Sequence, residues 1–142
     1  MKVLLVNGSP HKEGCTYTVL CEVADTLNNE NIETEIFLDW EQTNRGGIAC
    51  LKCREKGACV FNDVVNCFRE KAYDADRFVF GSPVHYAAAS GNMTAFMDRL
   101  FYSELNGNGN KAFYMKTVAA VISACRAGTT ATFDQLNKYF TI

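Results

Sequence analysis

The stretch KVLLVNGSPHKEGCTYT, residues 2–18, decides the fold of this chain. Its apolar run Val3–Val6 predicts a buried strand, and an amphipathic pattern from about Cys15 predicts a helix. The loop between them is polar, small and rich in hydroxyl groups. Because the free N–H groups and the dipole of a helix N-terminus favour negative charge, we expect this loop to hold a phosphate group.

The spacing of the loop excludes several kinds of phosphate site. Gly8 and Gly14 have no glycine between them, so the loop fits neither G-x-G-x-x-G nor G-x-x-x-x-G-K-[ST]. No cysteine is followed six positions later by arginine, which a cysteine phosphatase of similar architecture would need. A receiver domain would carry acidic residues where this chain has Asn7 and Ser9.

The composition favours a protein that binds small molecules. The 142 residues are enough for one domain with a buried core, and the net charge of -2 comes without a basic tract, which argues against nucleic acid as a partner. No apolar run approaches the roughly 20 residues of a membrane helix, and no signal peptide opens the chain, so a cytoplasmic location without membrane contact is expected. Seven cysteines in such a chain indicate reduced thiols.

Strand and helix patterns alternate along the rest of the chain. Continuous apolar strands between amphipathic helices predict an α/β fold, a doubly wound parallel sheet with helices on both faces. Ligands of such sheets bind beyond the carboxyl ends of the strands. Strands are expected at 3–6, 32–38, 77–81 and 117–123, helices from about 15, from 63 to about 73, from 91 and after 129, a polar loop at 39–60 and a surface turn at 106–110.

Five segments in order resemble one family. They are GSPHKEGCT at 8–16, a C-x2-C-x5-C segment followed by Val60 and Asp63, GSPVHYAAASG at 81–91, FMDR at 96–99 and RAGTT at 126–130. Together they are similar to the flavodoxin-like NADPH-dependent FMN reductase and iron–sulfur flavoprotein family. The resemblance implies one FMN-binding domain over 1–142 with strand order 2-1-3-4(-5). A fifth strand and last helix have no counterpart in these residues, so the fourth strand is expected to be a sheet edge.

The resemblance also implies which residues bind the cofactor. The phosphate loop falls on Ser9, His11, Cys15 and Thr16, the loop along the flavin ring on Pro83, Val84, His85 and Tyr86, and the loop after the fourth strand on Cys125 and Arg126. His11 stands where arginine is commoner in the family, and Cys15 where asparagine is commoner. No side chain is an obligate acid or base, because the flavin performs the transfer. Arg126 and His85 are expected to tune it, Arg126 by stabilising the anionic reduced ring.

Cys50, Cys53 and Cys59 form a separate candidate site. Four thiolates usually hold an iron–sulfur cluster, and this loop supplies three, so neither a cluster nor a zinc ion is expected although these residues remain possible ligands. A redox-active thiol loop, in which Cys50 and Cys53 form a reversible disulfide, is the preferred interpretation.

The predicted function is an FMN-dependent oxidoreductase. It would pass hydride from NAD(P)H through FMN to a quinone, a flavin or another small acceptor. The alternatives are a non-catalytic FMN electron-transfer protein and a thiol or iron–sulfur redox protein that uses the cysteine loop. A homodimer or homotetramer is expected, in which Asp98 and Arg99 pack a subunit interface or fix a loop.

Overall fold

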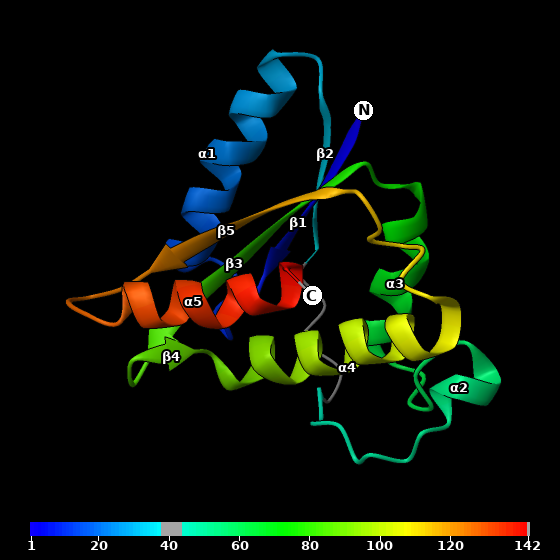
Figure 1. Cartoon of the computed structure of the whole chain (residues 1–142). Coiled ribbons are helices and arrows are strands. Elements are labelled where there is room, and N and C mark those ends of the chain that lie inside the picture. Colours follow the sequence, from blue (N-terminus) through cyan, green and yellow to red (C-terminus); the bar gives the residue numbers. More distant parts are fainter. Residues whose placement is uncertain (38–43, 142) are drawn as a thin grey trace.

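The computed structural model describes residues 1–37 and 44–141 and forms a parallel sheet covered by helices (Figure 1). The strand order β2-β1-β3-β5 confirms the predicted doubly wound α/β fold and the 2-1-3-4 order. The strands are β1 (Lys2–Asn7), β2 (Glu33–Phe37), β3 (Arg77–His85), the short antiparallel β4 (Ala88–Ala89) and β5 (Thr117–Ser123). The helices are α1 (Cys15–Asn29), α2 (Cys53–Lys56), α3 (Val64–Asp74), α4 (Gly91–Asn108) and α5 (Thr129–Phe140).

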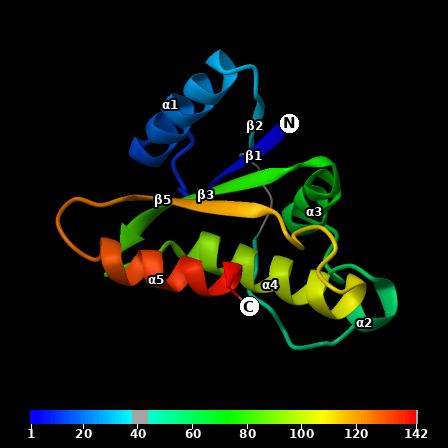
Figure 2. The same ribbon diagram turned by 45° about the horizontal axis from the view of Figure 1, so that its top comes forward.

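The two faces of the sheet carry different layers. Successive strand side chains point to opposite faces, so Val3 and Leu5 pack with Leu20 of α1. Leu4 and Val6 point to the other face, which α3, α4 and α5 cover (Figures 1 and 2). The alternation within one apolar strand therefore fixes both layers.

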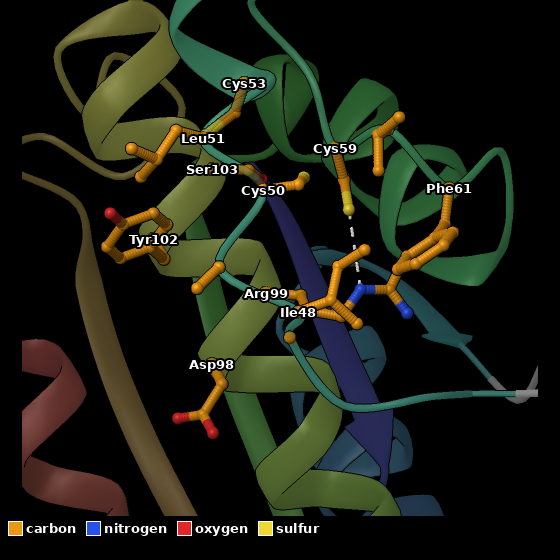
Figure 3. A pocket seen from close by; sticks show the side chains of 13 residues that line it. Ile48, Cys50, Leu51, Cys53, Cys59, Phe61, Asp98, Arg99, Tyr102 and Ser103 are labelled. Carbon is orange, nitrogen blue, oxygen red and sulfur yellow. Dashed lines mark hydrogen bonds between the residues drawn. The ribbon is translucent and has the colours of Figure 1, made fainter.

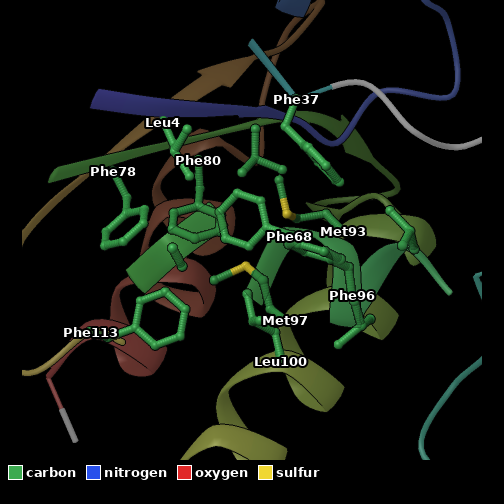
Figure 4. Close-up of a cluster of buried hydrophobic side chains, with 14 of the residues drawn as sticks. Leu4, Phe37, Phe68, Phe78, Phe80, Met93, Phe96, Met97, Leu100 and Phe113 are labelled. Carbon is green, nitrogen blue, oxygen red and sulfur yellow. The ribbon is translucent and has the colours of Figure 1, made fainter. Parts of the chain in front are cut away.

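An aromatic cluster fills the space between the sheet and α3 (Figure 4). Phe68 of α3 is fully buried at its centre. Its ring lies 5.1 Å from Phe37, 5.3 Å from Phe96 and 6.1 Å from Phe80, centroid to centroid. Such ring pairs add to the burial of apolar area, so Phe68 joins the sheet to α3 and α4.

Strand β5 lies at the edge of the sheet, as predicted. Its register with β3 runs from Arg77 opposite Thr117 to Pro83 opposite Ser123. Among the described residues β5 pairs with no other strand. Thr117 and Ala119 in the first half of β5 are exposed, whereas Val121 further along packs with the cluster beneath α1.

Three boundaries differ from the sequence prediction. β3 does not stop at Gly81 but continues to His85. Pro83 is tolerated there because the pairing of β3 with β1 ends at Gly81, so its missing N–H breaks no ladder bond on that side. The turn predicted at 106–110 is helical as far as Asn108. α4 ends there because Gly109 takes a left-handed φ of 66°. The loop predicted at 39–60 contains α2, and its residues 39–43, like Leu38 of the predicted second strand, lie outside the described residues.

No helix in the described part of the chain has the length and hydropathy to cross a membrane.

Candidate functional site

The carboxyl ends of β1, β3 and β5 form one rim, where the predicted site residues lie. The loop after β1 is tied to β3, since the Gly8 N–H donates to the Gly81 carbonyl at 2.7 Å. It is tied to α4 as well, because the Ser90 hydroxyl donates to the Gly8 carbonyl at 2.5 Å. Ser90 also caps α4 by accepting from the Met93 N–H.

The first loop arranges its own polar groups around a helix N-terminus. The buried Asn7 side chain accepts the Ser9 N–H at 3.0 Å, and the Ser9 hydroxyl accepts the His11 N–H at 3.1 Å. α1 then begins at Cys15 with none of the described side chains capping it and no acidic residue in its first turn. Its N–H groups can therefore bind an anion, which fits the phosphate of FMN.

Thr16 does not point its hydroxyl toward the loop opening. Its side chain is buried, and its Oγ1 lies 2.7 Å from Oγ of Ser123 at the end of β5. This hydrogen bond joins the first loop to the last strand. Sequence reasoning missed Ser123, because 107 residues separate it from Thr16 and no local pattern links them.

The β3–β4 hairpin forms the second side of the rim. Its turn residues Tyr86 and Ala87 have left-handed φ angles of 49° and 63°, and the Tyr86 side chain is fully exposed. Pro83 and Val84 are half-buried below it, while His85 is exposed. A half-buried apolar strand beside an exposed aromatic ring suits the flat ring of a flavin.

Gly128 brings the third loop against this hairpin. Its φ is 95°, and a Cβ at this position would lie 2.8 Å from the Ala87 Cα and 2.8 Å from the Val84 Cγ1. Only glycine permits both the backbone conformation and this approach. The loop before it leaves Cys125 and Arg126 exposed next to the hairpin.

The cysteine loop lies apart from the rim, beside a cavity of about 320 Å³ above α4 (Figure 3). Cys50, Cys53 and Cys59 all line it, together with apolar side chains such as Ile48 and Leu51. Within residues 1–37 and 44–141, no three His, Cys, Asp or Glu side chains lie close enough together to hold a metal ion. This loop supplies three thiols, whereas an iron–sulfur cluster is usually held by four, so the residues present do not fit one.

Arg99 holds this loop in place, one of the two roles expected for it. The residue is 4% exposed, and its guanidinium donates to Asp63 Oδ1 at 2.6 Å and to the Arg45 carbonyl at 3.0 Å. Burial in the protein lowers the pKa of Arg99, but its hydrogen bonds to Asp63 and Cys59 outweigh this and raise that pKa overall. Asp98 points elsewhere and accepts a hydrogen bond from the Tyr139 hydroxyl.

The sheet order defines a flavodoxin-like protein, whose rim places a helix N-terminus and a half-buried apolar hairpin at the carboxyl ends of the strands. The model of the family described as NADPH-dependent FMN reductase matches residues 1–142, and the chain belongs to that family. This confirms the family predicted from the sequence, and the family's description names NADPH and FMN.

Curated relatives share sequence along most of the chain. An iron–sulfur flavoprotein of Methanocaldococcus jannaschii is 29% identical over 147 residues, which cover 100% of this chain and 72% of the relative. An iron–sulfur flavoprotein of Clostridioides difficile is 30% identical over 102 residues, which cover 70% of this chain and 45% of the relative. The chain thus spans about half the length of the second relative.

Solved structures share the fold. RosB with the bound intermediate 8-demethyl-8-formylriboflavin-5'-phosphate superposes with a TM-score of 0.72 at 19% identity, over 98% of this chain and 58% of that one. The NAD(P)H:quinone oxidoreductase of Methanothermobacter marburgensis superposes with a TM-score of 0.63 at 14% identity, over 99% and 95%. At these identities the likeness shows the fold alone.

Proposed function

We propose that the chain passes hydride from NAD(P)H through FMN to a small acceptor such as a quinone or a free flavin. The observation that supports this most is the meeting of the three loops, through the Thr16–Ser123 hydrogen bond and the contact of Gly128 with the hairpin. These contacts hold the N-terminus of α1, which can bind a phosphate, beside the β3–β4 hairpin, which can contact a flat ring. The family match and the quinone reductase named among the structural neighbours agree with it.

The residues of the rim would divide the binding of FMN between them. N–H groups at the start of α1, with Ser9, His11 and Cys15 around them, would hold the phosphate. Pro83, Val84, His85 and Tyr86 would line one side of the ring and Cys125 the other. Thr16 would act through Ser123, by fixing the distance between the two loops.

Arg126 would carry the electrostatic part of the reaction. When bound, FMN supplies a ring that accepts hydride and releases electrons to a second substrate. An exposed guanidinium at the ring edge would favour the negative charge that develops there. No side chain has to move a proton for this transfer, which agrees with a site formed mainly of apolar and backbone groups.

A binding and turnover experiment tests the proposal. FMN titrated into the purified chain should lose fluorescence at saturation, and the complex should oxidise NADPH when menadione is present. Arg126→Gln should lower NADPH turnover about tenfold, which corresponds to ~1.4 kcal/mol of transition-state stabilisation. The same change at Arg54, an exposed arginine of α2 remote from the rim, is the matched control.

The outcomes separate the alternatives. A chain that takes up no FMN contradicts both flavin functions. A chain that binds FMN but leaves NADPH unoxidised is an electron carrier and not this enzyme. Equal turnover in the Arg126 and Arg54 variants would remove the role given to Arg126.

We also propose that the chain forms a homodimer or homotetramer. Apolar side chains on the outer faces of α4 and α5 support this, since Leu105 is 53% and Phe133 48% exposed. Light scattering should give a mass above that of one chain, and Leu105→Asp should lower it. A single-chain mass at micromolar concentration would contradict self-association.

A further inference from the structure

The cavity beside the cysteine loop lies against two packed helices, α2 and α4 (Figure 3). α2 packs closely on α4, because a Cβ at Gly107 would lie 2.8 Å from the Cys53 carbonyl oxygen. The Asn108 side chain adds a hydrogen bond to the Gly57 carbonyl. The side chains of Ile48, Leu51 and Tyr102 stand at the opening, each more than 40% exposed, so a ligand can enter from solvent.

Cys59 is held rigidly in the wall of this cavity. The Cys59 N–H donates to the Asn66 side chain at 3.1 Å, and the Cys59 carbonyl accepts from the same amide at 2.9 Å. These two bonds fix the backbone on both sides of the thiol. The Cys59 side chain is half-buried, whereas Cys15, Cys50, Cys67 and Cys125 are exposed.

A buried guanidinium points one N–H at the Cys59 sulfur. The Arg99 Nε donates to the Cys59 Sγ at 3.4 Å. The Arg99 Nη2 donates to Asp63, and the Arg99 Nη1 donates to the Arg45 carbonyl. The Phe61 ring centroid lies 5.1 Å from the guanidinium carbon, so these contacts together keep Arg99 from turning away. Asp98 at the cavity edge and Arg45 are the other charged groups near it. This contact fixes the direction of the Cys59 sulfur in the wall of the cavity.

We propose that this cavity binds a small flat apolar electrophile of the p-quinone class and that Cys59 adds to it covalently. The volume of about 320 Å³ and the apolar walls suit one or two fused rings. A thiol held beside a bound ring reacts as in an intramolecular reaction, an advantage that the exposed thiols outside the cavity, Cys15, Cys67 and Cys125, do not have.

The addition needs no further reagent. The Cys59 sulfur forms a bond to a ring carbon of the quinone C=C, and the electron pair of that double bond moves to a carbonyl oxygen. That oxygen takes up one proton, which balances the proton that the thiol releases to solvent. When the ring becomes aromatic, the attacked carbon loses its own proton and the second carbonyl oxygen gains one. The product is a hydroquinone thioether, in which the quinone is reduced by the sulfur that it gains. Neither FMN nor NADPH takes part, so this site is independent of the proposed flavin function.

The test uses 1,4-naphthoquinone as the probe on the full chain at neutral pH, without FMN. Intact mass and peptide mapping should place the first adduct on Cys59, about tenfold faster than on Cys67. Cys59→Ser should remove this first adduct. Cys67→Ser, which deletes an exposed thiol of α3, is the matched control and should leave it unchanged.

A second variant separates cavity binding from reactivity of the thiol alone. Ala49 lines the cavity on an exposed segment, so Ala49→Trp should fill the cavity without disturbing the core. In this variant the naphthoquinone adduct at Cys59 should become about tenfold slower, while alkylation of Cys59 by the smaller iodoacetamide persists. Adducts that appear first on the exposed cysteines, or an unchanged rate in Ala49→Trp, would overturn the proposal.

Discussion

Replacement of Asp63 by asparagine isolates the charge of a buried ion pair. Asp63 accepts the Arg99 Nη2 at 2.6 Å and also the Val65 N–H at 3.2 Å, as the cap of α3. Asparagine caps helices about as well as aspartate, so Asp63→Asn keeps the cap and removes only the negative charge. The Arg99 charge then stays buried without its counterion.

The structure sets the size of this effect. The side chains of Arg99 and Asp63 are 3% and 11% exposed, so solvent screens the pair little. Loss of one partner of a buried pair costs about 3–5 kcal/mol, and the open cavity beside Arg99 favours the lower end. We expect Asp63→Asn to lower the free energy of unfolding by about 3 kcal/mol, which corresponds to a fall in Tm of roughly 10 °C. Asp63→Ala should lose about 1 kcal/mol more, because the cap goes too.

Urea unfolding followed by circular dichroism measures both variants. Asp25→Asn is the matched control, since Asp25 is exposed on α1 and its replacement should change stability by less than about 0.5 kcal/mol. If Asp63→Asn unfolds with the same midpoint and slope as Asp25→Asn, the pair contributes no stability and the reasoning is wrong.

Three further perturbations address the rim, the core and the charges of the sheet edge. Gly128→Ala should weaken FMN binding and cost about 1–3 kcal/mol in urea unfolding, because its φ of 95° and the 2.8 Å approach to Ala87 exclude a Cβ; unchanged FMN affinity would contradict the contact. Phe68→Ala should cost about 3–5 kcal/mol in the same assay, and a cost below 1 kcal/mol would show that the aromatic cluster repacks. The hydrogen bond from Lys71 and then the one from Lys2 hold the pKa of Glu35 below its usual value, so its stabilisation is full at neutral pH and is lost as pH falls through that lowered pKa. Tm measured from pH 7 to 3 should therefore fall less steeply in Glu35→Gln than in the parent chain at the acid end, and parallel curves would refute the assignment.

Periodicity predicted the fold because the strands and helices follow local rules. Val3–Val6 is apolar on both sides, and the structure buries both sides under different helices. Asn62 and Asp63 both precede an apolar run and were both candidates for a helix cap, and in the structure Asp63 caps α3. The meeting of the loops after the first, third and fourth predicted strands follows from parallel strand direction alone.

Contacts between residues far apart in the sequence could not be predicted by such local rules. Arg99 lies on the apolar side of α4 near Phe96 and Leu100, and a charge in such a place indicates a buried partner. No local pattern identifies that partner as Asp63, because it lies 36 residues away in the sequence. The extension of β3 past Pro83 depends on where its neighbour β1 ends. A proline reads as a strand end in sequence, although here it occupies a position with no partner on one side.

Strand β5 presents a backbone edge that, among the described residues, no neighbouring strand occupies. Its sequence TVAAVIS contains neither charge nor proline, the two devices that usually keep sheet edges from joining. Any extended peptide, including the same strand of another molecule, can add there in register. Whatever covers β5 therefore decides whether concentrated solutions of this chain stay dispersed or form intermolecular sheets.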